Sequence, residues 1–143
     1  MISTTIEQSK HLVELGLNTE TADMSYYRDS YGNYMHKVET GKECDFTLTL
    51  DKYVPGDEWF DSVPAWSISA MFKQMPKGCD IRKHYGYDIN DLRYVAGIWE
   101  YSEYEGFSEY TKYTTKFYDN PIDAAYDLLC WLIENDYIKT KKQ

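Results

Sequence analysis

The chain has 143 residues, of which 43% are hydrophobic and 17% aromatic, and its formal net charge at pH 7 is −9. This length fits one domain with a core large enough to need no metal or disulfide, and the composition excludes a disordered tail. The negative charge disfavours direct binding to a nucleic-acid backbone, which requires basic side chains.

A first helix is predicted over residues 5–15. Thr4 can cap its free amides, and Glu7, three residues later, can complete a capping box. Gly16 can adopt the left-handed conformation after the last turn, so that Leu17 folds back onto the helix in a Schellman motif.

A short turn and three strands are predicted next. Thr19 or Thr21 can cap the turn. Two short strands are expected around a Gly32–Asn33 turn. Residues 46–50 alternate strictly between apolar and polar side chains, which predicts a half-buried strand. Its inward side chains are expected to be Phe46, Leu48 and Leu50.

A second helix is predicted over residues 64–75, with Pro64 in its first turn and Pro76 after its end. The two serines of this segment are expected on its polar side. Trp66 is interpreted as a core residue, with a binding role as the alternative. One stripe of the helix is expected to be buried, and it consists of Ala65, Ile68, Phe72 and Met75.

From Ile81 onward the sequence predicts strands. Residues 91–103 are apolar on both faces, which is typical of a central strand. A turn at Glu105–Gly106 and a returning segment over residues 108–118 predict an antiparallel hairpin. This hairpin is rich in glutamate and tyrosine.

The last helix is predicted over residues 121–134. Asn120 can cap it, and Asp123 lies in the first turn, where the helix dipole favours an acid. Asn135 can supply the C′ turn, and a frayed basic tail is expected from about residue 139. The buried stripe is expected to be Ile122, Ala125, Leu129 and Leu132.

Three helices and five or six antiparallel strands, without a βαβ rhythm, predict an α+β fold. We expect a single domain over residues 1–143, with the helices packed on the antiparallel sheet. No internal repeat, linker or low-complexity segment is visible in the sequence.

The three cysteines, Cys44, Cys79 and Cys130, are widely spaced and form no CxxC pair. They disfavour a disulfide framework and a zinc site, and they suit a reducing cytosol. The first residues lack a basic segment followed by an apolar run, so no signal peptide is expected. No apolar run approaches the roughly 18 residues of a membrane span. We therefore expect a cytoplasmic protein.

Motifs for chemistry are sparse. Glu7 with His11, and Asp80 with His84 if that stretch is helical, are pairs without a third metal ligand, and His36 stands apart. There is no nucleophile elbow, phosphate loop or dinucleotide fingerprint. The sequence predicts neither a cofactor nor a metal, and it predicts a protein that is not an enzyme.

Two tyrosine-rich segments are candidate surfaces: Tyr26–Tyr34 and the hairpin Glu100–Tyr113. Tyrosine offers a large apolar ring with a polar tip and is frequent at protein interfaces. A solvated hairpin tip and a sugar-cleaving carboxylate pair are the alternatives for the hairpin. The candidate partner-binding residues are Tyr26, Tyr27, Tyr101, Tyr104, Glu105, Tyr110 and Tyr113.

Three segments, LVELGLNTETADMSY, VPAWSISAMFKQMP and DNPIDAAYDLLCWLIENDYI, occur in this order. Together they resemble a family of small uncharacterised proteins of gut Bacteroidales bacteria, their phages and other mobile elements. The resemblance implies a bacterial cytosol, or the host cytoplasm if a phage encodes the protein. It implies no residue roles.

These observations favour a binding module that engages a protein partner through a tyrosine-rich surface. A protein of a mobile element that binds a small molecule or traps a nucleotide is an alternative. A nucleotide would need basic groups on its phosphate, for which Arg93, Lys112 and Lys116 are the nearest candidates. A second alternative is an acidic mimic of nucleic acid that acts on a host protein. A homodimer is expected only if the apolar helix stripes are exposed in the monomer.

Overall fold

The computed structural model describes residues 2–29, 46–55, 60–86, 90–102 and 108–140. The predicted α+β class is confirmed. In chain order the elements are α1 (Ile6–Glu14), the 3₁₀ turn η1 (Thr19–Thr21), β1 (Met24–Asp29), β2 (Thr47–Thr49), β3 (Phe60–Ala65), α3 (Ile68–Lys73), β4 (Cys79–Tyr85), β5 (Leu92–Ser102), β6 (Ser108–Thr114) and α4 (Pro121–Glu134).

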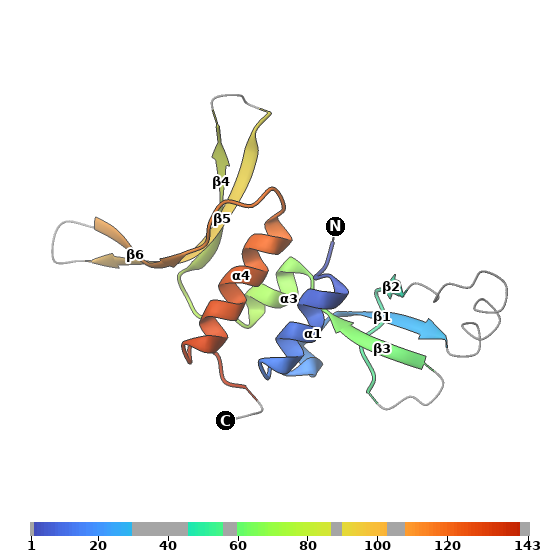
Figure 1. Cartoon of the computed structure of the whole chain (residues 1–143). Helices are drawn as coiled ribbons and strands as arrows, with labels where there is room; N and C mark the ends of the chain where they lie inside the picture. Colours follow the sequence, from blue (N-terminus) through green and yellow to red (C-terminus); the bar gives the residue numbers. More distant parts are fainter. Residues whose placement is uncertain (1, 30–45, 56–59, 87–89, 103–107, 141–143) are drawn as a thin grey trace.

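The strands are antiparallel, as predicted, but they divide into two three-stranded sheets in the described part of the chain. The first sheet has the order β2-β1-β3, and the second has the order β4-β5-β6. The helices lie between the two sheets, with α1 against β3 and α4 against β5 (Figure 1). The main core joins this helical layer to the second sheet, and the first sheet packs on the layer through α1.

The helix α1 begins with Thr5 as its cap, so the prediction of Thr4 is wrong. The Thr5 hydroxyl accepts the Gln8 N–H at 3.1 Å, and the Gln8 side chain accepts the Thr5 N–H at 2.9 Å. The capping box thus uses Gln8 and not Glu7. Thr4 is committed elsewhere, because its hydroxyl accepts the Trp66 N–H at 3.1 Å.

The predicted Schellman motif at the end of α1 is confirmed. Gly16 has a φ of 98°, in the left-handed region that glycine adopts without strain. The Leu17 N–H donates to the Leu12 carbonyl, and the Gly16 N–H donates to the Val13 carbonyl, each at 3.0 Å.

The turn η1 is capped by Asn18, so the prediction of a Thr19 or Thr21 cap is wrong. The Asn18 side chain accepts the Glu20 N–H at 3.1 Å. The Thr21 hydroxyl donates to the Asn18 carbonyl at 2.6 Å and accepts the Trp66 indole N–H at 2.9 Å. The Thr21 hydroxyl, which the sequence suggested as a cap, therefore takes part in a tertiary hydrogen bond with Trp66.

The strand β2 is shorter than predicted. It pairs with β1 over only three residues, and Leu50 is 78% exposed although its alternation predicted an inward side chain. The chain leaves the sheet there, because the Ser25 hydroxyl donates to the Asp51 carbonyl at 2.8 Å and draws the backbone across β1. The predicted Gly32–Asn33 turn lies outside the described residues.

The helix predicted over residues 64–75 is half as long as expected. Pro64 lies in β3 opposite Ser25, and α3 starts after Ser67, whose hydroxyl accepts the Ala70 N–H at 3.1 Å. Ser67 is therefore the cap and not part of a polar face. The helix starts later than predicted because Pro64 and Ala65 pair with β1. Proline is tolerated in β3 because β3 is an edge strand in the described sheet.

Trp66 fills the core, as predicted, with 0% of its surface exposed. It sits between β3 and α3 and is surrounded by a buried polar network at the start of the chain. The Thr4 N–H donates to the Trp66 carbonyl at 2.9 Å, and the Thr4 hydroxyl lies 2.7 Å from the Ser9 hydroxyl. The predicted stripe is buried or packed against the core: Ala65, Ile68, Phe72 and Met75.

The predicted hairpin is confirmed in the pairing of β5 with β6, and β5 is the central strand of its sheet. Its predicted Glu105–Gly106 turn lies outside the described residues. A register shift between Ile98 and Trp99 interrupts the ladder. At this position β5 passes from its pairing with β4 to its pairing with β6, and the two hairpins diverge (Figure 1).

The helix α4 has its predicted bounds. Asn120 caps it by accepting the Ile122 N–H at 2.8 Å, and the stripe Ile122, Ala125, Leu129 and Leu132 is buried. The left-handed residue at its end is Asp136, with a φ of 63°, and not Asn135. The tail predicted from about residue 139 lies mostly outside the described residues. In the described ranges, no helix is long and apolar enough to cross a membrane.

Candidate functional site

The two tyrosine-rich candidate segments belong to different sheets. Tyr26 and Tyr27 lie on β1 in the first sheet, whereas Glu100 and Tyr113 lie on β5 and β6 in the second. The helical layer separates these sheets (Figure 1). The structure therefore does not bring the candidates together, and they form two separate sites.

Tyr26 and Tyr27 are neighbours on a strand and point to opposite faces. The Tyr26 side chain is half-buried, and its hydroxyl donates to the Thr4 carbonyl at 2.8 Å. Tyr26 therefore holds the first residues of the chain against β1. The Tyr27 side chain is 38% exposed on the other face, so it can contact a ligand.

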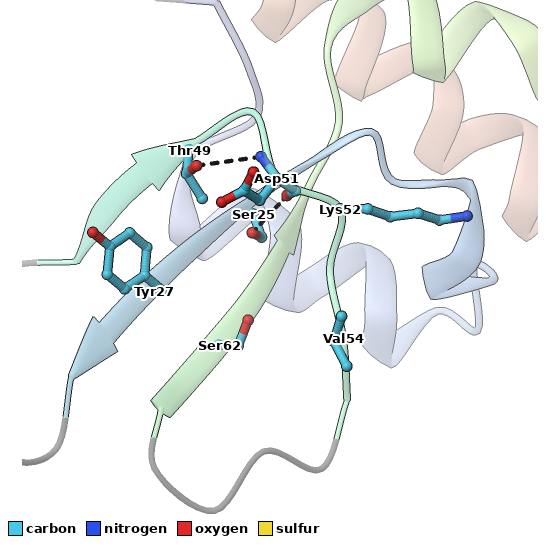
Figure 2. A pocket seen from close by; sticks show the side chains of 7 residues that line it. All are labelled: Ser25, Tyr27, Thr49, Asp51, Lys52, Val54 and Ser62. Carbon is cyan, nitrogen blue, oxygen red and sulfur yellow. Dashed lines mark hydrogen bonds between the residues drawn. The ribbon is translucent and has the colours of Figure 1, made fainter.

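Tyr27 borders a pocket of about 260 Å³ on the outer face of the first sheet (Figure 2). The strands supply Ser25, Tyr27, Thr49 and Ser62 to it, and the segment after β2 supplies Asp51, Lys52 and Val54.

The chain around Asp51 is fixed by two of these hydroxyls. The Thr49 hydroxyl accepts the Asp51 N–H at 3.2 Å, and the Ser25 hydroxyl donates to the Asp51 carbonyl at 2.8 Å. Figure 2 shows the Asp51 carboxylate on the side of Thr49 and Ser25, while the Lys52 side chain extends away in the opposite direction. Lys52 also lines the pocket, but the end of its side chain lies away from the Asp51 carboxylate (Figure 2).

A second hollow of about 350 Å³ lies between α1 and β3 and shares Ser62 with the first pocket. Its lining combines apolar side chains with one acid and one base. The residues that line it are Lys10, Val13, Glu14, Thr19, Tyr53, Ser62, Val63 and Pro64.

The second candidate site is the hairpin of β5 and β6. Tyr101 pairs with Glu109, and Tyr110 pairs with Glu100, so these backbones are in register across the hairpin. The side chains of Tyr101 and Tyr110 lie outside the described residues, as do Tyr104 and Glu105 entirely. The described part of this site is the base of the hairpin.

Three aromatic rings stack at that base. Tyr113 and Trp131 have centroids 4.5 Å apart and an interplanar angle of 5°, and Trp131 and Tyr137 have centroids 5.4 Å apart. Lys112 binds Glu100 at 2.8 Å and lies 5.7 Å from the Tyr137 ring centroid. We call Glu100, Lys112, Tyr113, Trp131 and Tyr137 the aromatic corner.

Only part of the aromatic corner is available to a partner. Tyr113 is half-buried against α4, and its hydroxyl donates to Asp127 at 2.8 Å. Tyr137 is 39% exposed and forms the outer end of the stack. Tyr113 therefore anchors the hairpin, and Tyr137 is the aromatic group that a partner can reach.

The thiols at the described positions are not activated nucleophiles. Burial raises the pKa of Cys79 to about 11 and is the main cause that raises the pKa of Cys130 to about 12. Both thiols are therefore protonated at neutral pH, and it is the thiolate that reacts.

The histidine pairs do not form metal sites in the described ranges, where no group of three ligand residues occurs. Asp80 and His84 lie on strand β4 and not on a helix. Their positions are about 13 Å apart at the rise of a strand, so they cannot share an ion. His11 faces Glu14 at 3.8 Å, not Glu7.

The basic residues named for phosphate binding are engaged separately. Arg93 pairs with Asp91 at 3.1 Å, Lys112 pairs with Glu100, and Lys116 lies 5.2 Å from the Tyr118 ring centroid. None of the three lines either pocket described above. They do not form one phosphate cradle.

Sequence reasoning missed Asp51, Val54 and the pair Trp131–Tyr137. Asp51 and Val54 follow β2. The alternation of apolar and polar residues predicted a longer strand there, so the segment after β2 was not recognised as separate. Trp131 lies one helical turn after Asp127, and Tyr137 follows the helix end. The sequence shows the spacing of Trp131 and Tyr137, but it does not show that Tyr113 of β6 stacks on Trp131.

No protein-family model, curated protein or solved structure matches this chain at a significant level.

Proposed function

We propose that this chain is a non-enzymatic binding module of a bacterium or phage, acting in the cytoplasm. Its partner is a protein, and the binding surface is the tyrosine-rich hairpin of β5 and β6. The observation that carries the proposal is the aromatic corner. It supports the hairpin with stacked rings and leaves Tyr137 partly exposed beside it.

The geometry favours binding for an energetic reason. A hairpin on its own is at best marginally stable in water, so a recognition surface needs support from neighbouring elements. Here Tyr113 stacks on Trp131 of α4 and hydrogen-bonds Asp127. A pre-organised surface loses less conformational entropy on binding. Tyrosine adds large contact area with only two rotatable side-chain angles.

The acids of the hairpin define the partner's charge. Glu100 is paired with Lys112, but the sequence adds Glu103, Glu105 and Glu109 between β5 and the start of β6. Such an acidic segment favours a partner with a basic patch. The net charge of −9 attracts a basic partner toward the chain during association.

The test is affinity capture from host lysate with wild-type protein and two variants, Tyr104→Ala and Tyr110→Ala, followed by mass spectrometry. We expect both variants to weaken capture of one protein, to keep the wild-type Tm, and to make the remaining capture more salt-sensitive. Tyr85→Ala is the control, because Tyr85 is 57% exposed on the other hairpin.

Two results would contradict the proposal. Unchanged capture by both variants would make the hairpin a solvated tip. A nucleotide that raises the Tm, through a site involving Arg93, Lys112 or Lys116, would establish a nucleotide-trapping protein instead.

A further inference from the structure

The pocket on the first sheet presents a carboxylate whose main chain is held in place. Both main-chain groups of Asp51 are hydrogen-bonded to side chains of the sheet, to Thr49 at 3.2 Å and to Ser25 at 2.8 Å. Ser25 is itself buried, so this anchor is part of the core. The Asp51 carboxylate is thus presented from a fixed position on an exposed segment.

This carboxylate has no counter-ion in the part of the chain that the structure describes. The described ion pairs join other residues, and Asp51 takes part in none. Its neighbour Lys52 lines the pocket, but the end of the Lys52 side chain extends away from the Asp51 carboxylate (Figure 2). The net charge of −9 makes the surroundings attractive to cations and unattractive to anions.

The remaining walls suit an aliphatic chain that ends in hydrogen-bond donors. Val54 is 64% exposed, and it lies on the opposite side of the lining residues from the Tyr27 ring (Figure 2). The Ser62 hydroxyl has no protein partner among the described residues, so it can accept a hydrogen bond. Basic side chains use such sites by laying their stem on apolar surface and their charged head on acceptors.

The volume of the pocket is suited to a single side chain. At about 260 Å³ it is smaller than the roughly 300–1,000 Å³ of pockets that enclose whole small molecules. A partner protein can insert one residue and leave its main chain outside. Asp51 would repel the phosphates of a nucleotide placed beside it.

We propose that this pocket receives an arginine or lysine side chain of the partner protein. The cationic head binds the Asp51 carboxylate and the Ser62 hydroxyl, and the stem packs against Val54 and Tyr27. The inference rests on the proposed function only in that the partner is a protein. It adds a second contact point, on the opposite side of the helical layer from the hairpin.

The experiment is an NMR titration of the full chain with the capped peptide acetyl-Gly-Arg-Gly-amide. We expect saturable shifts of the amide signals of Thr49, Asp51 and Ser62. Asp51→Asn should weaken binding about two- to fivefold, the range for an exposed ion pair. Raising the ionic strength from about 0.02 M to about 0.3 M should also weaken it.

Matched controls make the result specific. Asp119→Asn removes the same charge from an exposed position before α4 and should leave peptide affinity unchanged. Lys52→Gln should leave the affinity unchanged or raise it, because it removes a nearby positive charge. The peptide acetyl-Gly-Glu-Gly-amide should not bind.

Four outcomes would overturn the inference. They are no shifts with the arginine peptide, equal binding by Asp51→Asn, equal binding of the glutamate peptide, and more than tenfold tighter binding of free spermidine. The titration contains no partner protein. A negative result therefore removes the pocket inference alone, while capture by the Tyr104→Ala and Tyr110→Ala variants decides the proposed function separately.

Discussion

Asp127 accepts hydrogen bonds from two tyrosine hydroxyls, one on β6 and one on the segment before α4. The Tyr113 hydroxyl lies 2.8 Å from one carboxylate oxygen, and the Tyr118 hydroxyl lies 2.5 Å from the other. Burial is the main cause that raises the pKa of both tyrosines, that of Tyr113 to about 12, and the Asp127 carboxylate raises them further. Both hydroxyls therefore stay protonated in the folded protein where an unfolded chain would begin to ionise.

This arrangement predicts a loss of stability in alkaline solution. Because the folded pKa lies above the unfolded value of about 10, the contribution is complete below pH 10. It should fall as the pH rises from about 10 to about 12. Urea unfolding at several pH values measures it, and Tyr118→Phe should reduce the alkaline loss by removing one ionisable hydroxyl.

The control for that measurement is Tyr85→Phe, which changes an exposed ring on β4. It should retain the wild-type pH dependence. If wild type and Tyr118→Phe lose stability in parallel above pH 10, the two-tyrosine contact with Asp127 does not act as described.

At the scale of elements, α3 shows how a short helix depends on its cap. It has six residues, too few to be stable on its own. The Ser67 hydroxyl accepts the Ala70 N–H at 3.1 Å and donates to Asp23 at 2.5 Å, while Asp23 also accepts the Ser67 N–H at 2.9 Å. The cap thus joins α3 to the residue before β1.

Replacing Ser67→Ala should therefore lower the free energy of unfolding by about 1 kcal/mol, within the range of about 0.5–2 kcal/mol for lost caps. Chemical denaturation measures it. Ser69→Ala is the matched control, because Ser69 is exposed inside the same helix and alanine has the higher helix propensity. A cost for Ser69→Ala equal to that for Ser67→Ala would contradict the cap assignment.

At the scale of the whole molecule, the helical layer and the second sheet share one core, to which α1 joins the first sheet by packing on β3. Buried residues of α1, α3, α4 and β5 belong to a single cluster that includes Leu12, Met71, Ile98 and Leu129. No residue of β1, β2 or β3 belongs to this cluster, so the first sheet depends on it through α1 and through Trp66, whose carbonyl accepts the Thr4 N–H. The two sheets should therefore unfold together.

Leu129→Ala tests this coupling. Leu129 is fully buried, and its truncation should cost about 2–5 kcal/mol. Amide hydrogen exchange should show reduced protection in β1 and β5 alike. Val13→Ala, at a position 38% exposed on α1, should cost much less. Loss of protection confined to β4, β5 and β6 would show two independently unfolding units.

The sequence by itself predicted the features that depend on neighbours in the chain. The bounds of α4 follow from its cap, its first-turn acid and its apolar stripe, all within fourteen residues. The Schellman motif at Gly16, the central position of β5 and the core position of Trp66 were predicted in the same way. Each results from periodicity or from a backbone conformation that few residues adopt.

Only the tertiary structure decided the features in which distant segments compete for the same groups. The Thr4 hydroxyl, which was predicted to cap α1, accepts the Trp66 N–H instead. Pro64, which was predicted to lie in a helix, pairs with β1 as part of β3. The pocket arises because Ser25 draws the backbone of Asp51 across the sheet, 26 residues away along the chain. Such contacts depend on three-dimensional proximity. They outweigh local propensity, which is worth only a few tenths of a kcal/mol to about 1 kcal/mol per residue.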